Sequence, residues 1–163
     1  MFVELALRYV KMLAVFALAW AGLWAYSAYS CVRVEGAEME PALARGSRKM
    51  IRPGAGVLED LHHDDFIVYL AAVQGKAPRV LAGRVIGLPG DRIRLERGEV
   101  VRNGTRLASP YVAANQRTQD DYAEILVPAD SVYVLGDSRR IAAASDSRAL
   151  GPIGRWAILG QIP

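Results

Sequence analysis

The pattern of apolar and polar positions divides the chain into two parts. From Met12 to Ser30 the sequence reads MLAVFALAWAGLWAYSAYS, nineteen positions without a charged residue. This run predicts a helix of roughly 28 Å, close to the apolar thickness of a bilayer. After Val32 the apolar residues alternate or form short runs between turn signals, as they do in strands. We therefore predict a mainly β protein, with an N-terminal transmembrane helix over residues 12–30 and an all-β domain.

The second part contains several short segments typical of strands. They occur in KMIRP, DDFIVYLAAV, RVLAGRVIG, the stretch that follows it to residue 107, AEILVPADSVYVLGD and a closing IGRWAILGQI. Pro89-Gly90, Gly98 and Asn103-Gly104 separate these segments, and Asn-Gly is a strong hairpin signal. No amphipathic helix of twelve residues is evident beyond the first. We place the domains at residues 1–31 and 32–163.

Charges beside the apolar run predict its orientation. Arg8 and Lys11 precede it, whereas Arg33 follows it with Glu35 close by. The positive-inside rule then predicts a single-pass protein of the cytoplasmic membrane, with a cytoplasmic N-terminus and a periplasmic C-terminal domain. Two alternatives stay open: a cleavable signal peptide, and a lipoprotein signal that ends at Cys31.

Composition narrows the classes of function. The 163 residues carry a net charge of +3, and basic and acidic residues are interspersed, so the basic stripe of a nucleic-acid-binding protein is absent from the sequence. One cysteine, Cys31, excludes an internal disulfide. His62 and His63 are adjacent and point apart, so they are poorly placed to share a metal ion. We expect no metal or other cofactor and no nucleic-acid partner.

Three motifs follow the apolar run in order. The first is GAEMEPAL, residues 36–43, and the second is GRVIGLPGD, residues 83–91. The third is GDSRRIAAASDSRALG, residues 136–151. Together they resemble the conserved boxes of bacterial type I signal peptidases, which are membrane-anchored serine peptidases that remove signal peptides from exported proteins. The resemblance covers nearly the whole chain from the predicted anchor to Gly160. Its matching positions, which we interpret as scaffold, are Gly36, Met39, Pro41, Arg84, Gly87, Pro89, Gly90, Asp91, Gly136, Asp137, Asp146, Ser147 and Arg148.

The departures from this resemblance fall on the catalytic positions. The resemblance assigns the nucleophilic serine to the position of Glu38 and the general-base lysine to that of Gly83. Serine needs an adjacent base, and a lysine acts as one only where burial lowers its pKa, so the two form a unit. No intact catalytic pair is left at these positions. Ser138 also replaces the usual asparagine of the third box.

Two expectations about the altered site follow. Glycine at position 83 would leave a void, and Glu38 would cap the vacated pocket by accepting hydrogen bonds from backbone amides; the alternative is a solvated Glu38 in a surface loop. Asp146 and Arg148 are two residues apart, so Arg148 can pair with Asp146 or with Asp137. A rebuilt active site would need Ser145, Lys76 or Glu38 in a new role.

These observations lead to two hypotheses about function. In the first, the chain is a catalytically inactive homologue, a pseudoenzyme that serves as an accessory or assembly subunit of a membrane protein complex. Its partners would be the lipid bilayer, other membrane protein subunits and an extended peptide bound by strand addition without cleavage. In the alternative, it is an active membrane-bound endopeptidase that processes exported precursors through a rearranged site.

Overall fold

The computed structural model divides the chain into two compact units. It describes residues 2–27, 30–53, 57–72 and 77–163, and within the first helix it describes the side chains of residues 8–23. The units are Met1–Ser30 and Cys31–Pro163. The boundary predicted from the sequence lies between residues 31 and 32.

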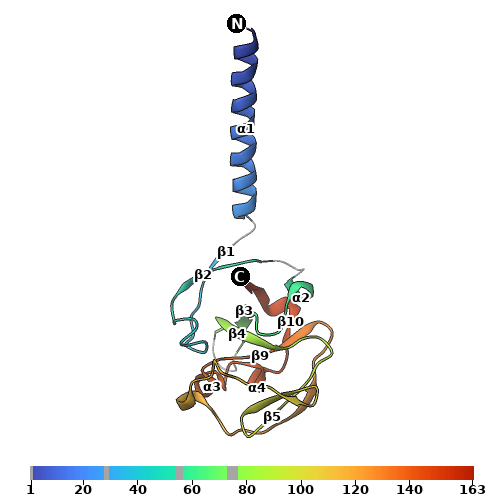
Figure 1. Ribbon diagram of the computed structural model, residues 1–163. Coiled ribbons are helices and arrows are strands. Elements are labelled where there is room, and N and C mark those ends of the chain that lie inside the picture. The colour runs from blue at the N-terminus through green and yellow to red at the C-terminus, as the bar shows by residue number, and fades with distance from the viewer. Residues whose placement is uncertain (1, 28–29, 54–56, 73–76) are drawn as a thin grey trace. The chain divides into compact units, whose positions relative to one another are not determined.

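The first unit is a single helix, α1, Phe2–Ser27 (Figure 1). It begins ten residues before the predicted span because FVELALRYVK has good helix formers and no glycine or proline. Among the residues that the structure describes, no helix has the length and apolar character needed to cross a membrane. The predicted transmembrane span over residues 12–30 is therefore not confirmed, and its positions 24–29 have no described side chains.

The second unit is built from three sheets. β1, Ser30–Arg33, pairs with β2, Arg48–Ile51. A five-stranded sheet has the order β10-β9-β4-β3-β11, and a four-stranded sheet has the order β7-β6-β5-β8. The strands of these two sheets are β3 Phe66–Ala71, β4 Arg79–Gly87, β5 Arg92–Glu96, β6 Glu99–Arg102, β7 Thr105–Arg106, β8 Tyr122–Leu126, β9 Ser131–Leu135, β10 Ile153–Gly154 and β11 Ile158–Ile162. The mainly β prediction is confirmed for this unit.

Short helical turns connect the strands. They are α2 Val57–Asp60, η1 Ala114–Gln116, α3 Arg139–Ala142, α4 Ser147–Leu150 and η2 Arg155–Ala157. The closing segment was predicted to be one strand, but η2 divides it into β10 and β11. Gly154 permits this break because a Cβ there would lie 2.7 Å from the Trp156 ring nitrogen.

Strand β4 is buried on both faces, because core residues cover it from two sides. Leu81 and Val85 belong to one cluster, which continues through Tyr69 and Val134 of the neighbouring strands. Ala82 contacts a second cluster formed with Val34, Met39 and Leu43, and Ile86 belongs to a third. This central strand therefore holds the first and second sequence motifs together.

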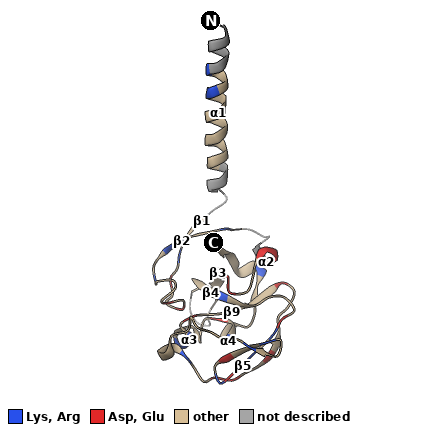
Figure 2. Cartoon of the chain, in the orientation of Figure 1, with Lys and Arg blue, Asp and Glu red and all other residues tan. Residues whose placement is uncertain are grey.

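Charges of both signs are interspersed on the four-stranded sheet (Figure 2). Arg92 pairs with Glu124 and Arg94 pairs with Glu96 across or along its strands. The turn between β6 and β7 contains Asn103 and Gly104, both with positive φ, as predicted for an Asn-Gly hairpin.

Candidate functional site

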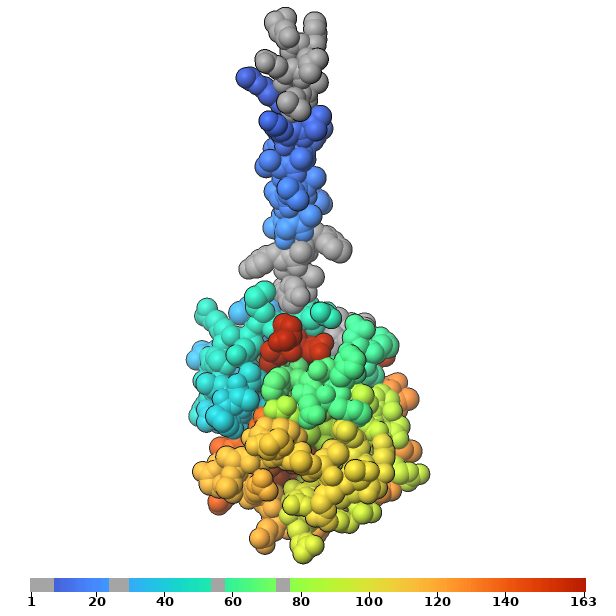
Figure 3. Space-filling model, viewed as in Figure 1, coloured from blue at the N-terminus to red at the C-terminus, as the bar shows by residue number. Residues whose placement is uncertain are grey.

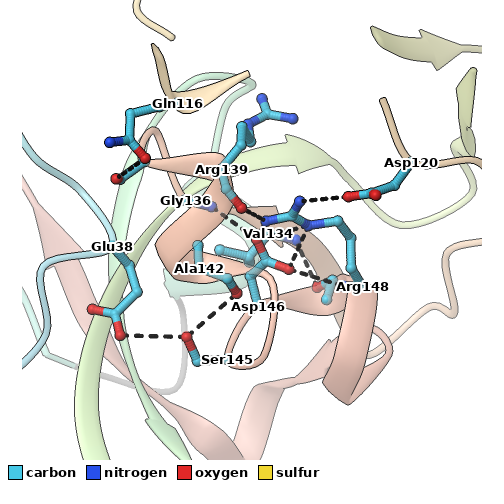
Figure 4. Close-up of polar contacts among 12 residues, drawn as sticks. Glu38, Gln116, Asp120, Val134, Gly136, Arg139, Ala142, Ser145, Asp146 and Arg148 are labelled. Carbon is cyan, nitrogen blue, oxygen red and sulfur yellow. Dashed lines mark hydrogen bonds and ion pairs between the residues drawn. The ribbon is translucent and has the colours of Figure 1, made fainter. Parts of the chain in front are cut away.

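Glu38 lies in the turn segment between β1 and β2, and its side chain is buried. The residue is 6% exposed, and Ser145 Oγ donates a hydrogen bond to Glu38 Oε1 at 3.3 Å (Figure 4). Glu38 Oε2 has no hydrogen-bond partner in the described part of the chain. Gly36 makes room for the carboxylate, because a Cβ at this position would overlap it. The solvated alternative is therefore wrong, and the observed donor is a hydroxyl group rather than the predicted backbone amide.

The main chain of Glu38 is also fixed to the third motif. The Ser138 amide donates to the Glu38 carbonyl at 2.8 Å. Gly136 allows this approach, because a Cβ there would lie 2.7 Å from the same carbonyl oxygen. Residues about a hundred positions apart in the chain thus form one wall of the site.

The predicted void at Gly83 does not exist. A Cβ built on Gly83 would overlap Val134 Cγ1 from β9 and would lie 3.3 Å from Tyr69 Cε1 of β3. Both neighbours are fully buried, so side chains of the adjacent strands already fill the space. This correction has a clear physical reason, because close packing in a core leaves few voids of methyl size or larger. A lysine at position 83 would need Val134 to move or to be replaced.

Tyr69 is a site residue that reasoning from the sequence missed. Its hydroxyl donates to the Ser145 carbonyl at 2.9 Å. Burial raises the pKa of Tyr69, and the charges of Asp146 and Glu38 raise it further, so the phenol is a neutral donor. The one signal available in the sequence was a polar-tipped aromatic residue inside the apolar run FIVYL, since a buried tyrosine needs a hydrogen-bond partner.

The third motif is organised by Asp146 and Arg148. The guanidinium of Arg148 donates to Asp146 through Nε at 3.0 Å and through Nη2 at 2.8 Å. Asp146 also accepts from the amides of Arg148 and Gly136, at 3.0 and 3.2 Å. Arg148 Nη2 reaches the Arg139 carbonyl at 2.6 Å. Of the two predicted pairings of Arg148, the structure contains the one with Asp146.

Asp137 pairs with Arg84 of the second motif instead. Arg84 Nε lies 2.9 Å from Asp137 Oδ1, and Nη2 lies 2.7 Å from Oδ2. The guanidinium carbon also lies over the rings of Phe66 and Tyr111, 4.5 and 3.8 Å from their centroids. Burial alone would lower the pKa of Arg84, but the hydrogen bonds and charge of Asp137 raise it. This buried pair joins β4 to the end of β9.

Asp91 closes the Pro89-Gly90 turn. It accepts hydrogen bonds from the Leu88 amide at 2.8 Å and from Asn103 at 2.7 Å, and it lies 2.7 Å from His63 Nε2. Burial would raise the pKa of Asp91, but these hydrogen bonds lower it below its usual range. Asp91 therefore stabilises the turn as a carboxylate.

The other motif positions pack beside these contacts. Met39 is fully buried, and Gly87 allows Ile93 to approach, since a Cβ would lie 2.8 Å from Ile93 Cγ1. Ser147 Oγ accepts from the Val134 amide at 2.8 Å. Ser138 Oγ donates to Gln116 Oε1 at 2.9 Å.

The groups of this site that can take part in chemistry are the Glu38 carboxylate and the Ser145 hydroxyl. In the described residues, no cationic side chain forms an ion pair with Glu38, and no group of three or more His, Cys, Asp or Glu side chains could hold a metal ion. Lys76, named above as a possible substitute base, lies outside the described residues.

Comparison with known proteins identifies the family to which the chain belongs. Residues 6–163 match the family described as Signal peptidase, peptidase S26. A signal peptidase I of Bacillus amyloliquefaciens is 30% identical over 136 residues, which are 78% of this chain and 70% of that protein. Signal peptidase I V of Bacillus subtilis (strain 168) is 29% identical over 142 residues, 80% of this chain and 81% of that protein. The chain belongs to the signal peptidase family, peptidase S26.

A solved structure agrees with the fold. The crystal structure of a signal peptidase I from Enterococcus faecalis V583 superposes with a TM-score of 0.50 at 23% identity. The match covers 63% of this chain and 97% of that chain. At this identity the likeness concerns the fold alone.

Proposed function

We propose that this chain is a non-hydrolytic member of the signal peptidase family. The observation that carries this proposal is that the position which the resemblance assigns to the nucleophile holds a buried carboxylate, that of Glu38, instead of a hydroxyl group. A carboxylate is a poor nucleophile toward a peptide bond, because the product would be a reactive anhydride. The space at Gly83 is filled by Val134 and Tyr69, so a lysine base has no room there. Loss of both members of a catalytic unit removes most of the rate.

The proposed role is that of an accessory or assembly subunit in a membrane protein complex. Ala14, Ala17 and Ala21 recur at helical spacing on α1 and give it one face of small residues, which favours close packing against other membrane helices. The proposed ligand is an extended peptide, which would bind by strand addition and would not be cleaved.

Membrane attachment is part of the same proposal. The described side chains of α1 are exposed, and large apolar ones such as Phe16, Leu18 and Trp20 are at least 65% exposed. Exposed apolar residues at this density are typical of a surface that contacts lipid or protein. Arg8 and Lys11 on the N-terminal side favour a cytoplasmic N-terminus and a periplasmic β domain.

The hydrogen bond from Ser145 Oγ to Glu38 Oε1 favours one second candidate, an active endopeptidase with a rearranged site. Here Ser145 Oγ would attack the scissile carbonyl, and Glu38 would accept its proton, since the two groups are within hydrogen-bond distance. Ser145 Oγ also lies 3.4 Å from the Ala142 carbonyl, which competes for the same proton.

A cleavage assay separates the two candidates. The full chain in detergent is incubated with a signal-peptide substrate, beside its Ser145→Ala variant and an active signal peptidase I as positive control. The proposal expects no cleavage above background by either form of this chain. Cleavage by the natural chain that disappears in Ser145→Ala would establish the peptidase candidate.

A reconstruction tests why activity is absent. The triple variant Glu38→Ser, Gly83→Lys, Val134→Ala restores the pair and removes the overlapping methyl group. We expect it to cleave, whereas the matched variant with Glu38→Ala in place of Glu38→Ser should stay inert. If the folded triple variant is also inert, the filled pocket and the missing pair are not the reason for inactivity.

The accessory role has a separate test. Mild detergent solubilisation of the tagged chain should recover other membrane proteins with it. Isoleucine at Ala14, Ala17 and Ala21 should release them, and Phe16→Ile on another face of α1 should not. Recovery of the chain alone would contradict a role as a subunit.

A further inference from the structure

A hollow in the β domain is lined by residues that form no described hydrogen bond with Glu38 or Ser145. Its volume is about 700 Å³, within the usual range of ligand pockets. The walls come from the turn between β5 and β6, the segment from Arg106 to Gln119, and Arg139 of α3. Figure 3 shows the yellow and orange segments of this region next to each other on the surface.

Arg139 is an unusual wall residue because it is buried and no carboxylate of the described residues forms an ion pair with it. It is 3% exposed, and its Nε and Nη2 atoms have no hydrogen-bond partner in the described part of the chain. In Figure 4 its guanidinium extends away from the neighbouring Asp146–Arg148 pair. The other buried arginines, Arg84 and Arg148, each have a carboxylate partner.

Burying the charged guanidinium of Arg139 in this way costs considerable free energy. Burial lowers the pKa of Arg139, and the neighbouring Arg148 lowers it further, while the tyrosinate form of Tyr111 and the nearby aspartates would act in the opposite direction. A guanidinium is not deprotonated in proteins, so the buried charge needs a partner. An anion from solution would supply one.

Other groups of the same hollow are complementary to an anion. Thr118 Oγ1 is buried and also lacks a hydrogen-bond partner in the described residues. Of the described residues that line the hollow, Arg97, Arg106 and Arg117 are basic as well, and Glu99 is acidic. Arg106 forms ion pairs with Glu96 and Glu99. Arg97 and Arg117 add positive charge to the walls.

The walls are held in place by the backbone. The Gly98 amide donates to the Asp120 carbonyl at 2.8 Å, and the Arg97 amide donates to Asp121 Oδ1 at 2.6 Å. A Cβ on Gly98 would overlap the Thr118 carbonyl, so glycine permits this close contact. Gly98 also has a φ of 77°, which suits glycine. The hollow is thus part of the folded structure.

We propose that this hollow binds a phosphate group, with Arg139 as the main contact and the Thr118 hydroxyl as a second donor. A guanidinium fork matches two oxygens of a phosphate, and the hydroxyl can donate to a third. The site is independent of the proposed function, because none of its residues contacts Glu38 or Ser145 through a described hydrogen bond. The phosphate can come from free phosphate or from the diester of a lipid headgroup.

Thermal unfolding of the full chain in detergent tests the site. Inorganic phosphate is added at constant ionic strength, with chloride as the reference anion. A specific ligand raises the midpoint as its concentration exceeds the dissociation constant. We expect a concentration-dependent rise for the natural chain and for Arg140→Met, the exposed neighbour on α3. We expect at least a tenfold weaker response for Arg139→Met.

Arg139→Met has a second expected signature. Without phosphate it should unfold at the same or a higher temperature than the natural chain, because it removes an unpaired buried charge. If it instead lowers the midpoint equally with and without phosphate, Arg139 is structural and the proposal is wrong. Thr118→Val, which keeps the shape, serves as the second variant and should weaken the phosphate response several-fold.

The source of the phosphate is decided by a further comparison. Glycerophosphoglycerol presents the diester of a lipid headgroup without its acyl chains. A response to it as strong as to inorganic phosphate assigns the site to headgroups, and a response to inorganic phosphate alone assigns it to free phosphate. No response to either beyond that to chloride would overturn the proposal.

Discussion

The overlap at Gly83 leads to a prediction that can be worked out from the packing. Gly83→Ala adds a methyl group that would overlap Val134 Cγ1. Extra volume in a packed core typically costs about 1–3 kcal/mol. Val134 is fully buried, so Val134→Ala alone removes two buried methyl groups at about 0.8 kcal/mol each, plus a cavity cost.

The two changes should compensate when they are combined, because the methyl group at position 83 occupies the space that Val134 leaves. We expect the double variant to be less destabilised than the sum of the single variants by about 1–2 kcal/mol. Urea unfolding of the full chain in detergent, followed by circular dichroism, measures each free energy of unfolding. Gly22→Ala is a matched control, since a Cβ there meets nothing within 4 Å, and it should add to Val134→Ala without coupling.

Additive effects of Gly83→Ala and Val134→Ala, to within about 0.5 kcal/mol, would refute the overlap. A neutral Gly83→Ala would do the same. Either result would mean that position 83 has free space after all. The physical argument against a buried lysine at this position would then fail, and with it one of the two supports for a non-hydrolytic site.

Three further predictions concern single side chains. Asp137→Asn breaks a buried ion pair and should cost about 3–5 kcal/mol in urea unfolding, whereas Glu124→Gln in an exposed pair should cost less than about 1 kcal/mol; equal costs would contradict the burial argument. Burial raises the pKa of Asp91, but its hydrogen bonds outweigh burial and lower it, so its contribution is present above the unfolded pKa near about 4 and is lost as the pH falls through the folded pKa. Asp91→Asn should therefore flatten the acid dependence of the unfolding free energy below about pH 4, and an unchanged slope would count against this assignment. Tyr69→Phe leaves the Ser145 carbonyl without its donor and should cost about 1–3 kcal/mol by the same measurement; a neutral result would show that the hydrogen bond is dispensable.

Much of the fold follows from local sequence. The Asn103-Gly104 hairpin, the Pro89-Gly90 turn and the apolar run at Phe66–Ala71 could be predicted because each depends on the preferences of a few adjacent residues. The three motifs, by their residues and their order along the chain, likewise indicated the family. The break in the closing strand was missed, because at this point the Arg155 amide donates to the Asp130 carbonyl, which belongs to a segment distant in the chain.

The surroundings of Glu38 and Gly83 are decided by contacts between distant segments. The sequence places Glu38 and Gly83 at two positions of the motifs, but it does not specify that Val134 and Tyr69 fill the space at Gly83 or that Ser145 contacts Glu38. Those neighbours come from strands and turns that lie far apart along the chain and are brought together by core packing.

The ion pairs also depend on contacts that the sequence alone does not specify. From the sequence alone, Arg148 could have paired with Asp137 or with Asp146, because both lie in the same motif. The fold places Asp137 beside Arg84, and among the described residues it gives the buried Arg139 no carboxylate in an ion pair. The sequence by itself thus determined which elements form and which family they build, since these depend on local preferences and short motifs. Tertiary structure alone decided which side chains meet in the core, because burial and pairing depend on residues that are distant in the chain.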